Sequence, residues 1–177
     1  MTNVPNQNSY AQIIELIFEN AQESIKYLDG DIKSLNTQLS AVTGFSAALI
    51  KFADDLPDRS IILISSLPCN SCSVFKILSL FLLSVAIFVS LGGLLPKKGG
   101  EDKIISPIEQ VEKCLGLSED EYKLLFIKQY DLDIRSLNNL RIWKAERLLW
   151  SGRFFVAAAI VSALNLILST GLKFLMG

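Results

Sequence analysis

Residues 77–96 read ILSLFLLSVAIFVSLGGLLP, twenty consecutive residues without a charge between Lys76 and Lys97. A second uncharged stretch, residues 154–172, reads FFVAAAIVSALNLILSTGL. A helix needs about 20 apolar residues to cross a hydrocarbon core ~30 Å thick. Both stretches meet that length and are apolar on every face, so they predict two transmembrane helices. Neither is a signal peptide, because both lie far from the N-terminus.

A third uncharged stretch, residues 34–50, is a weaker candidate because it contains several polar side chains. Small residues recur in it every four positions, a pattern that lets helices approach closely in lipid, at Ser40, Gly44 and Ala48. We therefore expect three spans, near residues 34–52, 77–95 and 154–173. Two spans remain an alternative, as do four, with the fourth in the uncharged residues 60–75, which Pro68 interrupts.

The chain has almost no strand pattern, so the expected fold is all-α: a helical membrane bundle with cytoplasmic amphipathic helices. The predicted parts are an amphipathic helix, a membrane region, a helical insert and a last span, at residues 1–33, 34–96, 97–153 and 154–173. The insert holds eleven of the seventeen Lys and Arg. The positive-inside rule places that insert in the cytoplasm. Under a bacterial reading, the bundle belongs to the inner membrane.

Apolar residues recur at helical spacing between Tyr10 and Leu28, which predicts the N-terminal amphipathic helix. The following Asp29-Gly30-Asp31 is either a break or a point where the helix runs on into the first span. We expect Asp31 to cap the helix of the first span and Lys33 to face lipid headgroups.

Ser118 and Glu121 form a capping-box pattern, and neither Pro nor Gly follows until Gly152. These features predict one long helix from Glu119 that continues through the last span. Two tryptophans seven residues apart and an arginine next to the span are typical of interfacial anchors, here Trp143, Trp150 and Arg153.

Two further features lie inside the apolar stretches. Gly92-Gly93 is expected to permit close helix packing or a kink. Asn165 is the one strong polar residue of the last span, and we expect it to bond to a neighbouring helix or a second subunit. A pore-lining amide is the less favoured interpretation of Asn165.

The chain contains no histidine, which excludes His-based acid/base catalysis, Ser-His-Asp triads and His-ligated metals. We find no convergent catalytic groups and expect a non-enzymatic protein without cofactor or metal. With 17 basic and 18 acidic residues, no net charge favours nucleic acid. Cys69 and Cys72 form a CxxC that is either a disulfide in an outward-facing loop or two small loop residues.

The order of these elements resembles the membrane effectors of bacterial cyclic-nucleotide defence systems, the Pycsar type, and the related SLATT membrane domains. The residues that carry the resemblance are Asp31-Ile32-Lys33 with Leu35, Leu39 and Phe45, and the Leu-, Ile- and charge-rich segment 121–147. The polar Asn36-Thr37-Gln38 departs from the apolar start expected of the family. The resemblance implies a protein that assembles and breaches the membrane after a nucleotide signal.

The expected function is therefore a small membrane effector that forms homo-oligomers and perturbs the bilayer. A cyclic nucleotide or a protein would be its partner at the cytoplasmic insert. No residue is assigned to ligand binding, and a solvated helix face is the favoured interpretation of the candidate phosphate contacts Lys103, Lys113, Lys123 and Lys128. The alternative is a membrane anchor or adaptor whose insert docks a partner protein.

Overall fold

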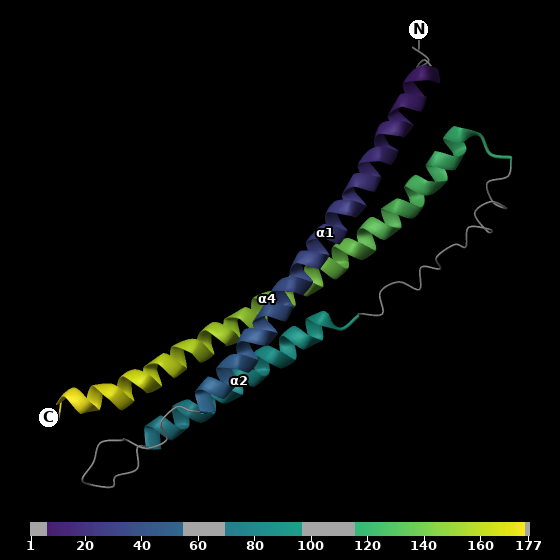
Figure 1. Cartoon of the computed structure of the whole chain (residues 1–177). Coiled ribbons are helices and arrows are strands. Elements are labelled where there is room, and N and C mark those ends of the chain that lie inside the picture. The colour runs from purple at the N-terminus through teal and green to yellow at the C-terminus, as the bar shows by residue number, and fades with distance from the viewer. Residues whose placement is uncertain (1–6, 55–69, 97–115, 176–177) are drawn as a thin grey trace. The chain divides into compact units, whose positions relative to one another are not determined.

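The computed structural model of the chain describes residues 7–54, 70–96 and 116–175. Three helices make up this part of the molecule: α1 (Gln7–Asp54), α2 (Asn70–Leu94) and α4 (Glu119–Leu175) (Figure 1). No strand occurs within these ranges, so the all-α expectation is confirmed for them. Several predictions fall outside what is described, namely the Cys69 and Cys72 side chains, most of the alternative span at 60–75, Lys103 and Lys113.

Helix α1 runs without interruption through Gly30. The helix therefore continues toward the first predicted span, and Asp29-Gly30-Asp31 is not a break. The prediction that Asp31 caps a helix is wrong, because Asp31 lies in the interior of α1. Its carboxylate instead forms an ion pair with the Arg141 guanidinium of α4, with an Nε–Oδ2 distance of 3.1 Å. Lys33 pairs with Asp29 one turn earlier on the exposed side of α1, at 2.6 Å.

Helix α4 begins at the predicted capping box. The backbone N–H and the hydroxyl of Ser118 both donate to the Glu121 carboxylate at 2.9 Å. In return the Glu121 N–H donates to the Ser118 hydroxyl at 3.4 Å. These bonds hold the pKa of the exposed Glu121 carboxyl below its usual range. From this cap α4 extends over 57 residues, which confirms the single long helix predicted from Glu119.

The chain divides into two compact units. Unit 1 combines α1 up to Ser34 with α4 up to Ile142. Within it the helices run in the same direction, since Phe18 contacts Tyr130 at a centroid distance of 5.6 Å and Asp31 contacts Arg141 farther along both helices. Lys123 of α4 adds to this pairing through the Glu15 carboxylate of α1. It also pairs with Glu119 one turn earlier in α4.

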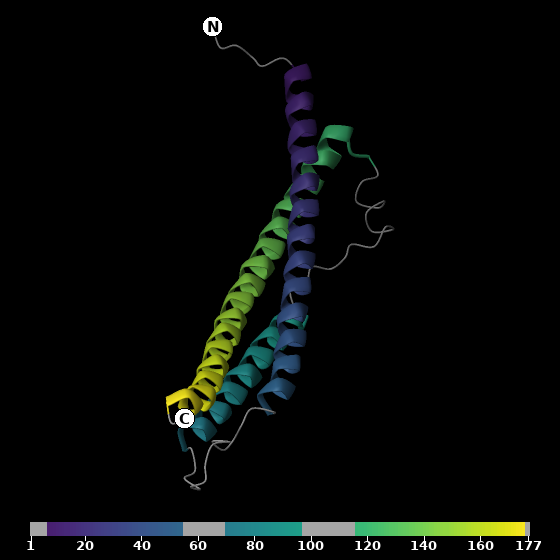
Figure 2. The ribbon, with the colours of Figure 1, turned by 60° about the vertical axis from the view of Figure 1, so that its left-hand side comes forward.

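Unit 2 combines α1 from Leu35, all of α2, and α4 from Trp143. Figures 1 and 2 both show α2 beside the C-terminal part of α1 and beside α4. Near the end of α2, Ser90 bonds to Thr43 of α1 and Gly93 bonds to Lys144 of α4. Nearer its beginning, Ser79 bonds to Ser162, farther along α4. Helix α2 therefore runs antiparallel to both. The unit begins on α4 at residue 143, eleven residues before the predicted last span at 154.

Two described helices are long and apolar enough to cross a membrane, α2 over Ser73–Leu94 and α4 within Glu119–Ile167. About a fifth of the most apolar window of each helix is buried in the structure, 22% for α2 and 17% for α4. A core helix of a water-soluble protein is mostly buried, so neither helix has that character. The span predicted near 34–52 lies in α1, outside these two helices, and stays a prediction.

The continuity of α1 gives a test at Gly30. A Cβ built there meets nothing within 4 Å, and the residue lies inside a regular helix. We expect Gly30→Ala to stabilise the protein by about 0.5–1 kcal/mol, because Ala loses less backbone entropy in a helix than Gly does. Thermal unfolding followed by circular dichroism in detergent measures this change. Gly116, whose φ is +102°, is the control, since Gly116→Ala is strained and should destabilise.

Candidate functional site

Lys144 joins the three helices of unit 2 at one point. Its side chain comes from α4 and its ammonium group donates to the Asn36 amide oxygen of α1 at 2.8 Å. A second bond, at 2.7 Å, goes to the Gly93 carbonyl near the end of α2. Lys144 is only 5% exposed, and no carboxylate forms an ion pair with it in the described residues. A buried ammonium of this kind depends on its hydrogen-bond acceptors.

The missing side chain at Gly93 lets α2 approach α1 and α4 closely at this junction. A Cβ at Gly93 would lie 2.9 Å from Leu39 Cδ1 and 3.1 Å from Arg147 Cβ. The neighbouring Gly92 has open space where its Cβ would be. The close packing predicted for the glycine pair is therefore a property of Gly93, and α2 passes through both residues as a regular helix.

Hydroxyl groups connect the same helices farther along. The Thr43 and Ser90 hydroxyls link α1 to α2 at 2.7 Å, and the Ser79 and Ser162 hydroxyls link α2 to α4 at 2.6 Å. Ser90 also donates to the Ala86 carbonyl of its own helix at 2.9 Å. Each pair forms a direct side-chain hydrogen bond between two helices, a contact that also stabilises helix packing within lipid.

The interior of unit 2 combines polar and apolar side chains. Among the described residues, the buried polar ones are Ser46, Ser79, Ser90, Lys144, Ser151 and Asn165, and the buried apolar ones are Leu39, Ala53, Leu83, Ala86 and Ala158. Partly buried leucines, an isoleucine and Phe155 pack against Ala53, Leu83 and Ala158. Phenylalanines stand outside, with Phe88 76% and Phe45 66% exposed. Several buried polar groups beneath exposed phenylalanines are unusual for a small helical bundle in water. We call the buried polar residues, together with Thr43 and Ser162, the polar seam.

The structure separates the four residues expected at helix interfaces. Ser40, Gly44 and Ala48 are exposed on α1, and a Cβ at Gly44 meets nothing within 4 Å. Asn165 is fully buried inside unit 2, and neither its amide oxygen nor its nitrogen has a hydrogen-bond partner there.

The expected anchors come together on α4. The Arg153 guanidinium lies over the Trp150 ring at 5.0 Å, and the Arg147 guanidinium lies over the Trp143 ring at 5.5 Å. Trp150 is half exposed. Such stacking attracts the cation to the electron-rich ring face and leaves the outer guanidinium N–H groups available.

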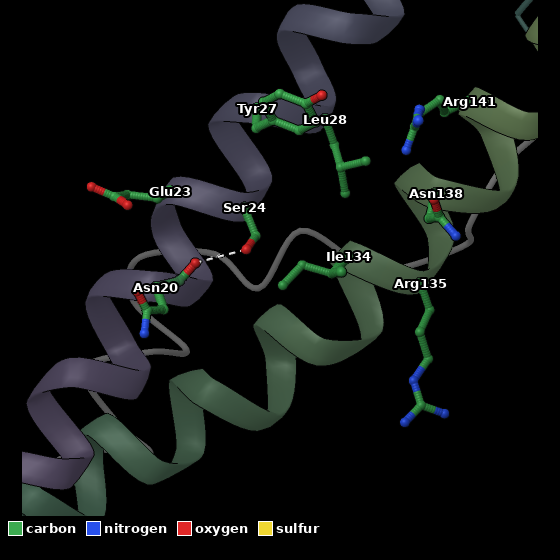
Figure 3. Close-up of a pocket in the computed structure, with 9 residues that line it drawn as sticks. All are labelled: Asn20, Glu23, Ser24, Tyr27, Leu28, Ile134, Arg135, Asn138 and Arg141. Atoms are coloured by element: carbon green, nitrogen blue, oxygen red, sulfur yellow. Dashed lines mark hydrogen bonds between the residues drawn. The ribbon is translucent and has the colours of Figure 1, made fainter.

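Unit 1 holds a groove of about 600 Å³ between α1 and α4 (Figure 3). Leu28 and Ile134 reach toward the space between the helices, whereas Glu23 points away from α4. Both cationic side chains of the groove are already paired, Arg135 with Asp131 at 2.8 Å and Arg141 with Asp31. Lys123, a candidate phosphate contact, is likewise held by two carboxylates, and Lys128 is exposed. The groove therefore offers a phosphate no free cation.

Lys144 and Asn36 were not predicted as partners, although the sequence contained a signal. Asn36-Thr37-Gln38 departs from an apolar span, and a polar residue inside a span needs a partner on another helix. Periodicity could not identify that partner, because Lys144 lies 108 residues later and resembles its solvated neighbours in sequence.

Comparison of the chain with protein-family models, with curated proteins and with solved structures finds no match.

The two glycines of α2 form a matched pair for testing the junction. We expect Gly93→Ala to destabilise unit 2 by about 1–3 kcal/mol, because its methyl group would overlap Leu39 and Arg147. Gly92→Ala should be neutral or stabilising, since its methyl enters open space. Chemical unfolding of both variants in the same detergent gives the comparison. Equal stability of the two variants would contradict the close approach at Gly93.

A second test removes one acceptor of the Lys144 ammonium. Asn36→Leu should destabilise the protein by about 1–3 kcal/mol, because a buried charged donor then keeps only the Gly93 carbonyl of its two acceptors. Asn36→Leu combined with Lys144→Leu should recover part of that loss, since no charge remains buried. Asn139→Leu, at an exposed amide of α4, is the control and should change unfolding little.

Proposed function

We propose that unit 2 is embedded in a lipid bilayer and that the chain forms homo-oligomers that perturb the membrane. The buried polar side chains and the exposed phenylalanines of unit 2 carry this proposal. In water, its exposed phenylalanines and isoleucines would be unfavourable at roughly 25 cal/mol for each Å² of apolar surface. In lipid they are neutral, and helices there associate through small residues and interhelical hydrogen bonds, as the polar seam does.

The assembly surface in this proposal is the exposed stripe of Ser40, Gly44 and Ala48 on α1. The stripe has no packing role in the single chain, because a Cβ at Gly44 contacts nothing. Small residues at this spacing let two backbones come close, which favours dispersion contacts between copies. Bulky phenylalanines, Phe45 and Phe52, are exposed on the same helix and would contact lipid or a neighbouring copy.

The resemblance to Pycsar-type effectors extends the proposal to nucleotide-signalled anti-phage defence at a bacterial inner membrane. Residues 97–153 lie in the cytoplasm in this scheme, because they hold eleven of the seventeen basic residues. Since the cations described in unit 1 are largely paired, a nucleotide would have to displace carboxylates from Arg135 or Arg141. Such displacement would loosen the pairing of α1 with α4 and so act on the whole helix pair.

The adaptor function is the second candidate, and exposed apolar side chains on unit 1 favour it. Ile13 and Leu16 on α1 are 51% and 59% exposed, and Leu132 on α4 is 54% exposed. A two-helix unit leaves such residues without cover, and a partner protein would bury them. This function requires membrane anchoring by unit 2 but no change in membrane permeability.

Membrane potential in bacteria that express the full chain separates the two functions. The effector function predicts depolarisation, restricted to cells with raised cyclic nucleotide if the defence scheme is right. Gly44→Leu should abolish depolarisation and self-association in crosslinking, because the leucine side chain separates the two backbones.

Gly92→Leu is the matched control, since it adds the same side chain at another helical glycine with open space around its Cβ. Depolarisation by Gly44→Leu equal to that of the unmodified chain would remove the stripe as the interface. Absence of depolarisation in every state, with the protein inserted, would favour the adaptor.

A further inference from the structure

Unit 2 contains a recess of its own, which is separate from the polar seam and from the α1 stripe. It is a cavity of about 440 Å³ lined by one residue of α2 and five of α4: Val89, Trp143, Glu146, Arg147, Trp150 and Phe154. Trp143, Arg147, Trp150 and Phe154 follow each other at spacings of three and four, so they share one face of α4. The Asn36–Lys144 junction lies one residue from the start of this face.

Two guanidinium groups lie at the recess, one from a lining residue and one over a lining ring. Arg147 lines it and Arg153 lies over the ring of Trp150, one of its walls. Neither guanidinium forms an ion pair anywhere in the described ranges 7–54, 70–96 and 116–175. Glu146 is the acidic residue among the lining side chains and offsets one of the two charges. Arginine forks with free N–H edges bind phosphate oxygens in pairs.

The recess also changes in polarity along α4. Along α4 the charged lining residues Glu146 and Arg147 come before Trp150 and Phe154, and Val89 of α2 adds an apolar side chain. Trp150 and Phe154 lie 6.2 Å apart between their ring centroids and continue the aromatic wall. From residue 143 to residue 154 the helix rises by about 16 Å, at ~1.5 Å per residue. That length is comparable to a lipid headgroup followed by the upper part of an acyl chain.

From this arrangement we infer that the recess binds an anionic phospholipid. Its phosphate contacts the guanidinium groups of Arg147 and Arg153, and its upper acyl chain lies against Phe154 and Val89. A zwitterionic lipid is disfavoured because its ammonium group would meet two arginines. The inference rests on the bilayer embedding of unit 2 and is independent of whether the chain assembles or depolarises cells.

The sequence supplies a direct probe of this site, because Trp143 and Trp150 are the two tryptophans of the chain and both line the recess. The full chain is placed in phosphatidylcholine vesicles that contain a fixed minor fraction of a brominated lipid. Bromine quenches tryptophan fluorescence on contact. We expect brominated phosphatidylglycerol to bind roughly tenfold more strongly than brominated phosphatidylcholine, given two basic side chains near one phosphate.

Two variants decide whether the preference comes from the recess. Arg147→Gln should reduce the preference severalfold, and Arg147→Gln with Arg153→Gln should remove it, while quenching by phosphatidylcholine persists. Arg135→Gln is the control, because that arginine lies in unit 1 and pairs with Asp131. It should leave the preference unchanged. Helix content by circular dichroism verifies that each variant is folded.

Three results would overturn the inference. Equal quenching by both lipids would mean that the recess contacts bilayer lipid without selecting its charge. A preference that survives the double variant would assign the selectivity to other basic residues. Relief of quenching by inorganic phosphate in the buffer would identify a free-anion site instead of a lipid site.

Discussion

The Lys144 ammonium holds α1, α2 and α4 at one point, and the packing of unit 2 follows from that bond set. Its two acceptors, the Asn36 amide and the Gly93 carbonyl, lie on different helices, so the bonds fix all three in register. Because no carboxylate of the described ranges pairs with this buried charge, the helices must approach closely enough for both acceptors to reach it. The missing side chain at Gly93 makes that approach possible.

Beyond this junction, hydroxyl pairs and a small apolar cluster hold the helices together. Thr43 with Ser90 and Ser79 with Ser162 connect the helices, and Ala53, Leu83 and Ala158 form the cluster. Other large apolar residues, Phe45 and Phe88 among them, face outward. Such a bundle is stable where the surroundings are apolar, and this agrees with the proposal that unit 2 lies in a bilayer. The Asn165 amide of the seam is buried and has no hydrogen-bond partner among the residues that the structure describes.

Individual elements were predictable to different degrees. Periodicity and the Ser118–Glu121 pair predicted the start and the continuity of α4, because a capping box is local chemistry. The same local reasoning failed at Asp31, where an acidic residue after Gly30 resembled a helix start. The carboxylate serves Arg141 instead, a contact that sequence spacing does not reveal. The anchors Trp143, Trp150 and Arg153 were found from their position beside the apolar stretch, but their stacking geometry was not.

The sequence by itself determined the helices, because helix formation depends on neighbouring residues and on the apolar stretches, which are visible along the chain. It also determined that two of these helices are long and apolar enough to span a membrane. Only the tertiary structure decided which faces turn inward, that Lys144 is buried, and that Gly93 instead of Gly92 is the contact point. The physical reason is that these choices depend on pairs such as Asn36 and Lys144, which are 108 residues apart and meet only after the helices pack.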